Sequence, residues 1–553
     1  MEGFPKFVAK MFRTRLIAFL MFVFASAAHA ENTRVATVQF VHLAIRNAIH
    51  AHVPQTNPSW INTGANTRIA NMEYLLCLVD MANAAINMGP TTNYCESEYA
   101  TTQAANVEAV KNAAERLITF APRFWLHLTD VKAGEEFSFR IDAVHGTYSV
   151  NWGDGTPPQI LHMTPATARR TFTQDGDYVI GLGGFTSAHG LLEIRSSITF
   201  ENSPLRAKVT KLEGDLGAVF PTIGDGSGAT LRPRFINTFR GFTGLTEIPE
   251  TLFAGIERTG ATMFQGTFAD CTNLTSIPEN LFATIKGPPQ NSMFANTFNN
   301  TGITEIPENL FSSIQGLSAD AMFSGTFRNA GVTGSIPENL FAGIQGPPRA
   351  HMFARTFADN PNMTGSIPEN LFAGIQGSPE SAVFDGTFQN TGLTGPIPEN
   401  LFAGVQGPPR QNIFNSTFRD VPGLTGIIPG RLFAGIAGPP DAWMFQNTFR
   451  NSTGLTGIGD GLFDGIHGNA SSWMFDGTFN GCTGLTGPSA RTLINPDNPV
   501  LDTDTQEEIN AKRQFVWEKF MGNNGSPWAG HSNNMYTGAT GLSDFHIMST
   551  IWR

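Results

Sequence analysis

The residues best placed to do chemistry are five glutamates that recur at one position of a sequence repeat. Each stands between a proline and an asparagine, and the five are Glu279, Glu308, Glu338, Glu369 and Glu399. Carboxylate oxygens are preferred ligands of Ca²⁺, so a stacked row of these side chains is a candidate calcium ladder. Because like charges at close spacing repel, the alternative is that water solvates each carboxylate at the start of a helical turn. We expect the solvated arrangement, with the asparagines bonded to backbone groups.

Other catalytic patterns are missing from the sequence. The 12 histidines are scattered without an HExxH or a Cys–His spacing, and neither a Gly-x-Ser-x-Gly motif nor a Walker phosphate motif occurs. The glycine-rich stretch Gly224–Gly228 lacks the lysine of a phosphate loop and is interpreted as a linker. The sequence therefore predicts no enzyme, no cofactor and no metal centre.

Candidate binding residues lie where the sequence of the repeat varies from unit to unit, just after a Gly-Pro break. They are Arg349, Arg410, Trp443 and Trp473. The two tryptophans share one position in neighbouring repeats and are a candidate aromatic platform for a sugar or a protein; a contact in the core or in a cap is the alternative.

Charge and composition limit the partners. The formal net charge is −11 and 41% of the residues are apolar, which excludes a disordered acidic tail. The sequence has no basic footprint for nucleic acid, so we expect neither DNA nor RNA as a partner.

An internal repeat positions all of these residues. A Thr-Phe pair recurs nine times with a period of about 30 residues. Each unit offers a short strand such as Leu274–Ile277, a helical turn from Pro278, and a second helical turn from Met293 to Phe298. Since one unit cannot bury its own apolar face, residues 231–487 are predicted to form a leucine-rich-repeat-like solenoid of short parallel strands and helical turns. The phenylalanines of the repeated pair are Phe239, Phe268, Phe298, Phe327, Phe357, Phe388, Phe418, Phe449 and Phe479.

The stretch Thr267–Ile277 resembles the Ala-Phe-x-x-Cys-x-x-Leu-x-x-Ile core of BspA-like leucine-rich-repeat surface proteins of host-associated bacteria. Met535–Asp544 repeats the motif once more and is expected to cap the array. The usual unit of that family is shorter, at about 23 residues. The resemblance implies surface display and adhesion to a host or bacterial surface protein or glycan.

The N-terminal region has the features of an exported protein. Lys6, Lys10, Arg13 and Arg15 precede an apolar run, and Ala28–Ala30 is a small-x-small cleavage pattern, so residues 1–30 are predicted to be a signal peptide. An uncleaved anchor is the alternative, although the apolar run is shorter than the roughly 20 residues that span a bilayer. No later segment is predicted to cross a membrane, and the mature chain is expected to be extracellular or on the cell surface.

The four cysteines are interpreted in two pairs. Cys77 and Cys95 are close in sequence and are predicted to form a disulfide after export. Cys271 and Cys482 occupy the same position in repeats that are far apart along the array, so they are expected to be buried small residues, neither paired nor metal ligands.

Between Phe124 and Ile180 the pattern changes to alternating strands. The loop Trp152–Thr156 and the later segments Arg170–Phe172 and Gly176–Val179 resemble the polycystic-kidney-disease (PKD) domain, which implies a β-sandwich. Asp154 in that loop is either a cation ligand or part of a type I′ turn, and we expect the turn.

The predicted organisation is therefore multidomain. After the signal peptide come a small helical N-terminal domain (31–118), the PKD-like β-sandwich (119–203), a linker or N-terminal cap (204–230), the solenoid (231–487) and a C-terminal cap (488–553). The predicted function is adhesion, or binding of a protein or glycan, through the solenoid surface. A purely structural surface-layer or spacer protein is the alternative, and a hydrolase within residues 31–118 is a further one.

Overall fold

The computed structural model describes residues 122–142, 146–162, 166–186, 197–200, 203–220, 223–224, 230–231, 233–468, 471–492, 503–513, 515–516 and 534–548. Contacts between residues divide the chain into two compact units. The predicted signal peptide, the predicted helical N-terminal domain and the predicted Cys77–Cys95 disulfide lie outside the described residues.

The described part of the first unit contains three antiparallel strands and the start of a fourth. Strand β3 (Gly146–Asn151) pairs with β4 (Gln159–His162) on one side and with β6 (Gly176–Thr186) on the other. Strand β1 (Pro122–Val131) follows β6 in the strand order. The buried side chain of Trp152 donates a hydrogen bond from Nε1 to Oε1 of Gln159, at 3.1 Å, which satisfies its polar atom inside an apolar core.

The second unit begins with a three-stranded antiparallel sheet. Strand β2 (Glu136–Asp142) lies between β5 (Ala166–Thr171) and β7 (Ser197–Thr199), and its alternate residues are buried, as one face of a pleated strand requires. The remaining elements before the repeats are η2 (Pro204–Lys208), β8 (Val209–Gly214), α5 (Leu216–Val219), β9 (Ile223–Gly224) and β10 (Thr230–Leu231).

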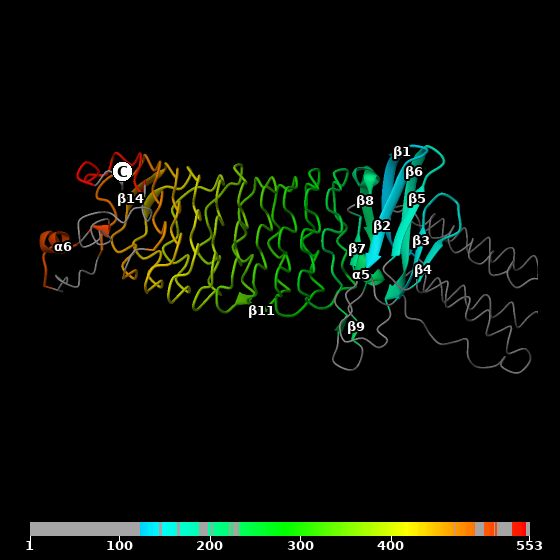
Figure 1. Ribbon diagram of the computed structural model, residues 1–553, viewed down its shortest axis with the longest axis horizontal. Helices are drawn as coiled ribbons and strands as arrows, with labels where there is room; N and C mark the ends of the chain where they lie inside the picture. Colours follow the sequence, from blue (N-terminus) through cyan, green and yellow to red (C-terminus); the bar gives the residue numbers. More distant parts are fainter. Residues whose placement is uncertain are drawn as a thin grey trace, which may run out of the picture. The chain divides into compact units, whose positions relative to one another are not determined.

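The repeats form a stack of coils, one coil per repeat (Figure 1). Backbone amides at every second position bond to the next coil; the amides of Phe264, Gly266 and Phe268 donate to carbonyls 2.8 to 2.9 Å away. The intervening amides bond three residues back within their own coil, as Thr267 does to Phe264. In the segment around each Thr-Phe pair, positive φ recurs every four residues, and one example is the series Ser292, Asn296, Asn300. The backbone of this segment therefore repeats every four residues.

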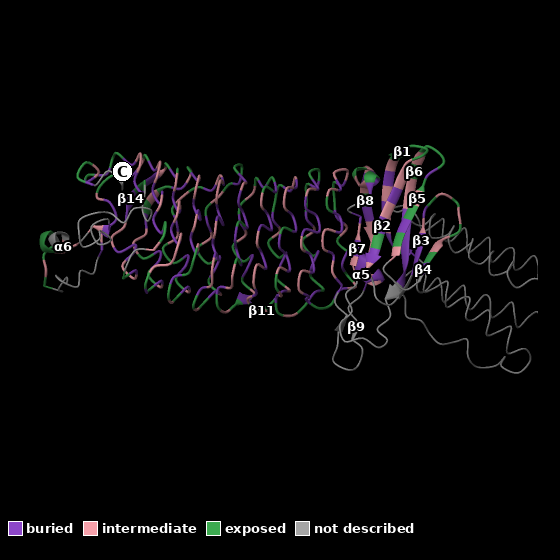
Figure 2. Ribbon diagram, viewed as in Figure 1, coloured by how far each residue is buried: buried purple, intermediate pink, exposed green. Residues whose placement is uncertain are grey.

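Phenylalanine fills the interior of this stack. One column runs through the nine Thr-Phe positions and ends on Tyr536, with successive ring centroids 5.2 to 6.0 Å apart and nearly parallel rings. Two further columns contain Phe264 and Phe282 and their equivalents in the other coils. Buried and exposed segments alternate around each coil (Figure 2). The core is therefore continuous from coil to coil, and no coil has a core of its own.

The threonine of each Thr-Phe pair is also buried. From Thr267 onward its hydroxyl donates to the carbonyl of a phenylalanine in an earlier coil; Thr356 reaches Phe323 at 2.9 Å and Thr387 reaches Phe353 at 2.9 Å. A buried hydroxyl without a partner would cost free energy, so this bond explains why the repeat keeps threonine there.

The predicted fold class is wrong. The described residues contain only two α-helices, α5 and α6 (Gln506–Lys512), and neither lies within the repeats. The strands among the described residues form small sheets that are mostly antiparallel. From Pro278 onward the amides of Leu281, Ala283 and Ile285 bond three residues back, whereas a helix requires bonds four residues back at successive positions. The chain forms turns at the places where helical turns were predicted.

Parallel strands are also scarcer than predicted. In the described part of the array only β11 (Gly316–Leu317) with β12 (Ile344–Gln345), and β13 (Gly426–Ile428) with β14 (Leu455–Ile458), form parallel strand pairs. The other coils meet through isolated parallel bridges and through the turn ladder described above.

A segment after the repeats contributes the final coil. The amides of Phe479 and Gly481 donate to the carbonyls of Met535 and Thr537, each at 2.7 Å. Tyr536 is completely buried against Phe479, and burial raises the pKa of its hydroxyl. The last phenylalanine of the column is thereby covered by a ring.

Candidate binding site

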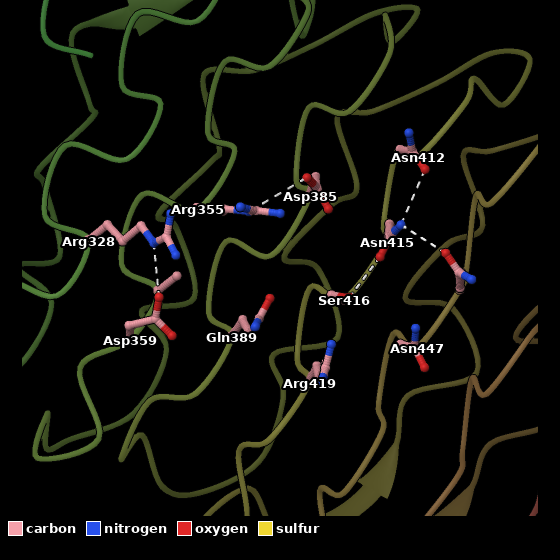
Figure 3. Close-up of a pocket in the computed structure, with 12 residues that line it drawn as sticks. Arg328, Arg355, Asp359, Asp385, Gln389, Asn412, Asn415, Ser416, Arg419 and Asn447 are labelled. Atoms are coloured by element: carbon pink, nitrogen blue, oxygen red, sulfur yellow. Dashed lines mark hydrogen bonds and ion pairs between the residues drawn. The ribbon is translucent and has the colours of Figure 1, made fainter. Parts of the chain in front are cut away.

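A polar groove opens on the array where the outward-facing side chains of five successive coils meet (Figure 3). Its volume is about 450 Å³. Three arginines line it with two aspartates and five side-chain amides, and Ala358 is the single apolar residue of the lining. The polar lining residues are Arg328, Arg355, Asp359, Asp385, Gln389, Asn412, Asn415, Ser416, Arg419, Gln446 and Asn447.

The four-residue repeat of the backbone conformation positions these side chains. Positive φ occurs at Arg355, Asp359, Asn412, Ser416 and Asn447, and in each case the residue that follows is buried. Asparagine and aspartate tolerate this conformation better than other L-residues, which explains their abundance at these positions. The groove is therefore a direct product of the turn geometry.

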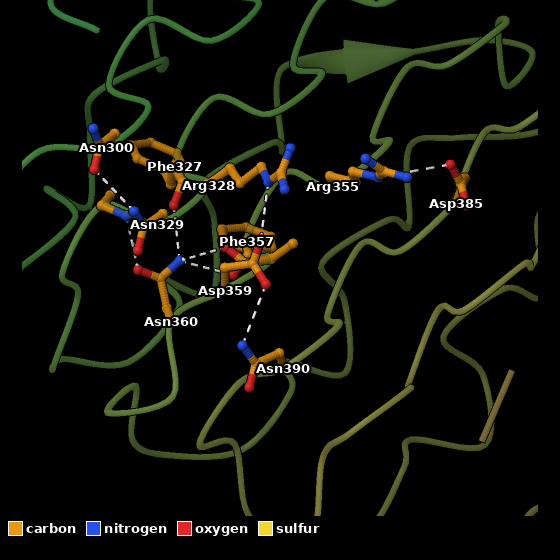
Figure 4. Close-up of polar contacts among 12 residues, drawn as sticks. Asn300, Phe327, Arg328, Asn329, Arg355, Phe357, Asp359, Asn360, Asp385 and Asn390 are labelled. Atoms are coloured by element: carbon orange, nitrogen blue, oxygen red, sulfur yellow. Dashed lines mark hydrogen bonds and ion pairs between the residues drawn. The ribbon is translucent and has the colours of Figure 1, made fainter. Parts of the chain in front are cut away.

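A ladder of aspartates and asparagines borders the groove (Figure 4). Nδ2 of Asn390 donates to Asp359 at 3.2 Å, and Nδ2 of Asn329 donates to Asn300 at 2.9 Å. Nε of Arg328 donates to Asp359 at 2.9 Å from the adjacent coil. The carboxylates in this column are thus separated by amides and neutralised by arginine, which avoids stacking like charges.

Arg355 and Asp385 face one another inside the groove. Nε of Arg355 lies 3.9 Å from Oδ2 of Asp385, which is an ion pair but too long for a hydrogen bond. The arginine side chain is 51% exposed and the aspartate side chain 23% exposed. Burial raises the pKa of Asp385 above its usual range, and the charges of Arg355 and His351 oppose that shift only in part. The ionised form of Asp385 therefore lowers the stability of the folded protein.

Replacing Asp385 with asparagine is expected to stabilise the protein near neutral pH. Because the folded-state pKa of Asp385 is raised, its favourable contribution is complete below the ordinary pKa and is lost as the pH rises through the raised value. Asp385→Asn should therefore increase the free energy of unfolding at pH 7. It should change that free energy little at about pH 3, where the Asp385 carboxyl is mostly protonated in both the folded and the unfolded state. Urea denaturation of the full chain at the two pH values measures this. Lower stability of the variant at pH 7 would mean that the attraction to Arg355 outweighs burial.

The tryptophans predicted to bind a ligand lie in the column that passes through Asn412. Trp443 and Trp473 have φ of 55° and Asn412 has φ of 58°, so all three adopt the same outward conformation in consecutive coils. Trp443 is half-buried and Trp473 is 39% exposed. Neither is enclosed in the core, so both are partly exposed along the column that contains the groove residue Asn412.

The predicted arginines lie outside the groove lining. Arg349 is engaged on both sides, with Nε 3.1 Å from Asp320 and Nη1 2.6 Å from Glu380 in the two neighbouring coils. Arg410 is exposed. Pairs of this exposure contribute little stability individually, so Arg349 is best described as one member of an alternating surface row of charges.

The five aligned glutamates are all exposed. Nδ2 of Asn309 donates to Oε1 of Glu279 at 2.6 Å, and Asn280 makes the same bond to Glu250. At these two positions an amide lies beside the carboxylate, and these two asparagines bond carboxylates where backbone groups were expected. Within the described ranges, His, Cys, Asp and Glu residues nowhere gather in a group of three that could hold a metal ion.

The Trp152–Thr156 loop uses its carboxylate internally. Oδ1 of Asp154 accepts hydrogen bonds from the amide of Thr156 at 3.1 Å and from its hydroxyl at 2.6 Å. Gly153 and Gly155 have positive φ but Asp154 does not, so the predicted type I′ turn is not formed. A β-carbon at Gly153 would lie 2.5 Å from the carbonyl oxygen of Val179, which requires glycine there.

Cys271 and Cys482 are buried, unpaired thiols, each pointing at a backbone carbonyl of the preceding coil. Burial raises the pKa of both thiols to about 12, which makes them poor nucleophiles and poor metal ligands. Across the described ranges no helix has both the length and the apolar character needed to cross a membrane.

Sequence reasoning missed the groove residues Arg355, Asp385, Gln389, Asn415 and Arg419. They occupy the two variable positions between Met-Phe and Thr-Phe, or the position after Thr-Phe. The signal was present, because these positions vary while their neighbours do not. These variable positions were predicted to lie in helical turns, so they were not recognised as parts of a single surface.

No protein-family model, curated protein or solved structure matches this chain.

Proposed function

We propose that this chain is an exported, non-enzymatic binding protein that holds a glycan or protein ligand on the surface of its repeat array. The observation that carries the proposal is the polar groove of about 450 Å³, lined by side chains from five coils. The signal-peptide pattern and the resemblance to BspA-like surface proteins support display outside the cell.

The charges of the groove support binding over catalysis. Asp359 accepts from Arg328 and Asn390, and Asp385 faces Arg355, so each carboxylate of the lining has a cationic partner. A general acid–base pair would need carboxylates free to exchange protons with a substrate. Charged groups paired in this way instead suit recognition of a polar surface.

A structural spacer is the second candidate, and the uninterrupted phenylalanine column favours it. A stack with a continuous core transmits load from coil to coil without needing a ligand. The two functions differ in one measurable respect, because only the binding protein captures a ligand that competes for the groove face.

The mature chain, residues 31–553, is expected to capture specific members of a glycan or host-protein array. Replacing both groove-side tryptophans, Trp443→Ala with Trp473→Ala, should weaken capture by about tenfold or more, equivalent to ~1.4 kcal/mol, because aromatic faces stack on sugars and apolar side chains. Circular dichroism and the melting temperature should stay close to those of the wild type, since neither ring is in the core.

Leu317→Ala is the matched control, because Leu317 is an apolar side chain that is 67% exposed in β11, away from the groove. It should leave capture unchanged. If no array member is captured, the spacer function replaces the binding function. If the double variant binds normally, the ligand lies on another surface.

A further inference from the structure

We infer that the ligand of this groove is a linear acidic glycan, which lies along the stack with one acidic group held by Arg355. This inference rests on the proposed binding function and narrows it to one chemical class of ligand.

Charge is the first reason. The groove lining carries three arginines and two aspartates, whereas the whole chain has a net charge of −11. Asp420, which pairs with Arg419, brings the carboxylates at this face to three, so the face is close to neutral and repels an acidic ligand less than the rest of the chain does. Arg328 and Arg419 are anchored by Asp359 and Asp420 at 2.9 and 3.0 Å, which holds their guanidinium groups in place.

Arg355 is the arginine with unused hydrogen-bonding capacity. Its closest ion-pair contact, 3.9 Å from Asp385, is too long to occupy its donors. A guanidinium group binds carboxylate or sulfate through two parallel N–H bonds, which is a stronger interaction than a neutral hydrogen bond. Arg355 is thus the natural anchor for an acidic group.

The amides of the lining point to a carbohydrate. Gln389, Asn412, Asn415, Gln446 and Asn447 offer both donors and acceptors, as neighbouring sugar hydroxyls require. With Ala358 as the only apolar residue of the lining, the groove has little to offer a hydrophobic ligand.

The repeat explains why the glycan is linear. Equivalent outward positions recur once per coil, at a spacing of about 4.8 Å between neighbouring hydrogen-bonded segments. Sugar units in an extended polymer recur at a comparable spacing, so successive units meet successive coils. Beyond Asn412 the same column continues with Trp443 and then Trp473, where a sugar ring can stack on an aromatic face.

The test measures binding of the mature chain to three soluble polymers by calorimetry. They are a polyuronate, a sulfated glycosaminoglycan and a neutral glucan. We expect one or both acidic polymers to bind, the neutral one to bind at least about tenfold more weakly, and added salt to weaken binding. Comparison of the two acidic polymers identifies carboxylate or sulfate as the recognised group.

Arg355→Asn removes the anchor with the least disturbance to the fold. Asparagine occupies the equivalent position at Asn296 and Asn447, and in both cases glycine follows in the next coil, as Gly386 follows Arg355. This variant should lose acidic-polymer binding by about tenfold or more, whereas Asp385→Asn, which removes the opposing charge, should strengthen it.

Arg431→Asn is the matched control. It removes the same charge from an exposed residue outside the groove and restores the asparagine that other repeats carry at this position, such as Asn280. Binding should not change.

Four outcomes would overturn the inference. Equal binding of the neutral glucan, or acidic-polymer binding that Arg355→Asn leaves intact, removes the acidic-glycan assignment while the groove remains a binding surface. Capture of an acidic protein in an Arg355-dependent way, with no glycan bound, replaces the ligand class. Absence of any ligand whose capture depends on the groove residues or on the two tryptophans contradicts the proposed function as well.

Discussion

Phe357→Ala is expected to lower the free energy of unfolding by roughly 3–5 kcal/mol, the range for deleting a buried aromatic ring. The Phe357 ring is completely buried and stacks between Phe327 and Phe388, with centroids 6.0 and 5.9 Å away, and it also contacts Phe341. Alanine would leave a cavity that three neighbouring coils share. Urea denaturation gives the loss of stability, and hydrogen exchange shows where protection falls.

Exchange should accelerate in the coils of Phe327 and Phe388 as well as in the coil of the substitution, because the core is shared. Leu317→Ala, an exposed substitution in the same array, should change the stability by no more than about 0.5 kcal/mol. Faster exchange confined to the single coil that carries alanine would contradict a continuous core.

Asn360→Ala is expected to cost about 3 kcal/mol or more, through lost hydrogen bonds instead of lost packing. Asn360 is 1% exposed, and its Nδ2 donates to the carbonyls of Phe327 and Phe357, each at 2.8 Å. Its Oδ1 accepts from the amides of Ala330 and Val332 at 3.0 and 3.2 Å. Nδ2 also donates to the carbonyl of Ala358 at 3.2 Å, so alanine would leave five backbone groups without this partner, a loss of stability that urea denaturation measures.

Asn329→Gly provides the comparison. Asn329 is exposed, makes one side-chain bond to Asn300, and has φ of 49°, a conformation that glycine adopts freely. Its replacement should cost no more than about 1 kcal/mol. If the two variants proved equally stable, water would replace the hydrogen bonds of Asn360. The Asn360 side chain would then not be what joins the neighbouring coils.

These two residues describe how the array is held together. Phe357 belongs to a column of stacked rings that gains its stability from buried apolar area. Asn360 supplies polar bonds where neighbouring coils lack a regular strand pairing. Both effects depend on adjacent coils, and the same stacking places the polar groups of the groove side by side.

Part of this organisation could be predicted from the sequence. The Thr-Phe period indicates a stack of similar units, since no single unit of that size can bury its own phenylalanines. The shared position of Trp443 and Trp473 likewise follows from the period. Apolar residues such as Phe294 and Phe298 were recognised as facing one side, and both are buried.

From the sequence, helical turns could not be distinguished from the four-residue turns that the chain forms. Two apolar residues four positions apart share a face in a helix, and they also share a face in a backbone that repeats every four residues. The two alternatives differ in whether amides bond within the coil or to the next coil, and that choice depends on the neighbouring coil being present.

The sequence by itself determined the repeat, the residues that fill its interior, and the absence of a recognised catalytic motif, because these depend on residue type and spacing along the chain. Only the tertiary structure decided that Arg355, Asp385 and Asn415 lie together. They are far apart in sequence, and the left-handed conformation that turns Arg355 outward is imposed by hydrogen bonds between coils, such as that from its amide to the carbonyl of Asp385. A surface assembled from one or two side chains per coil exists only once the coils are stacked.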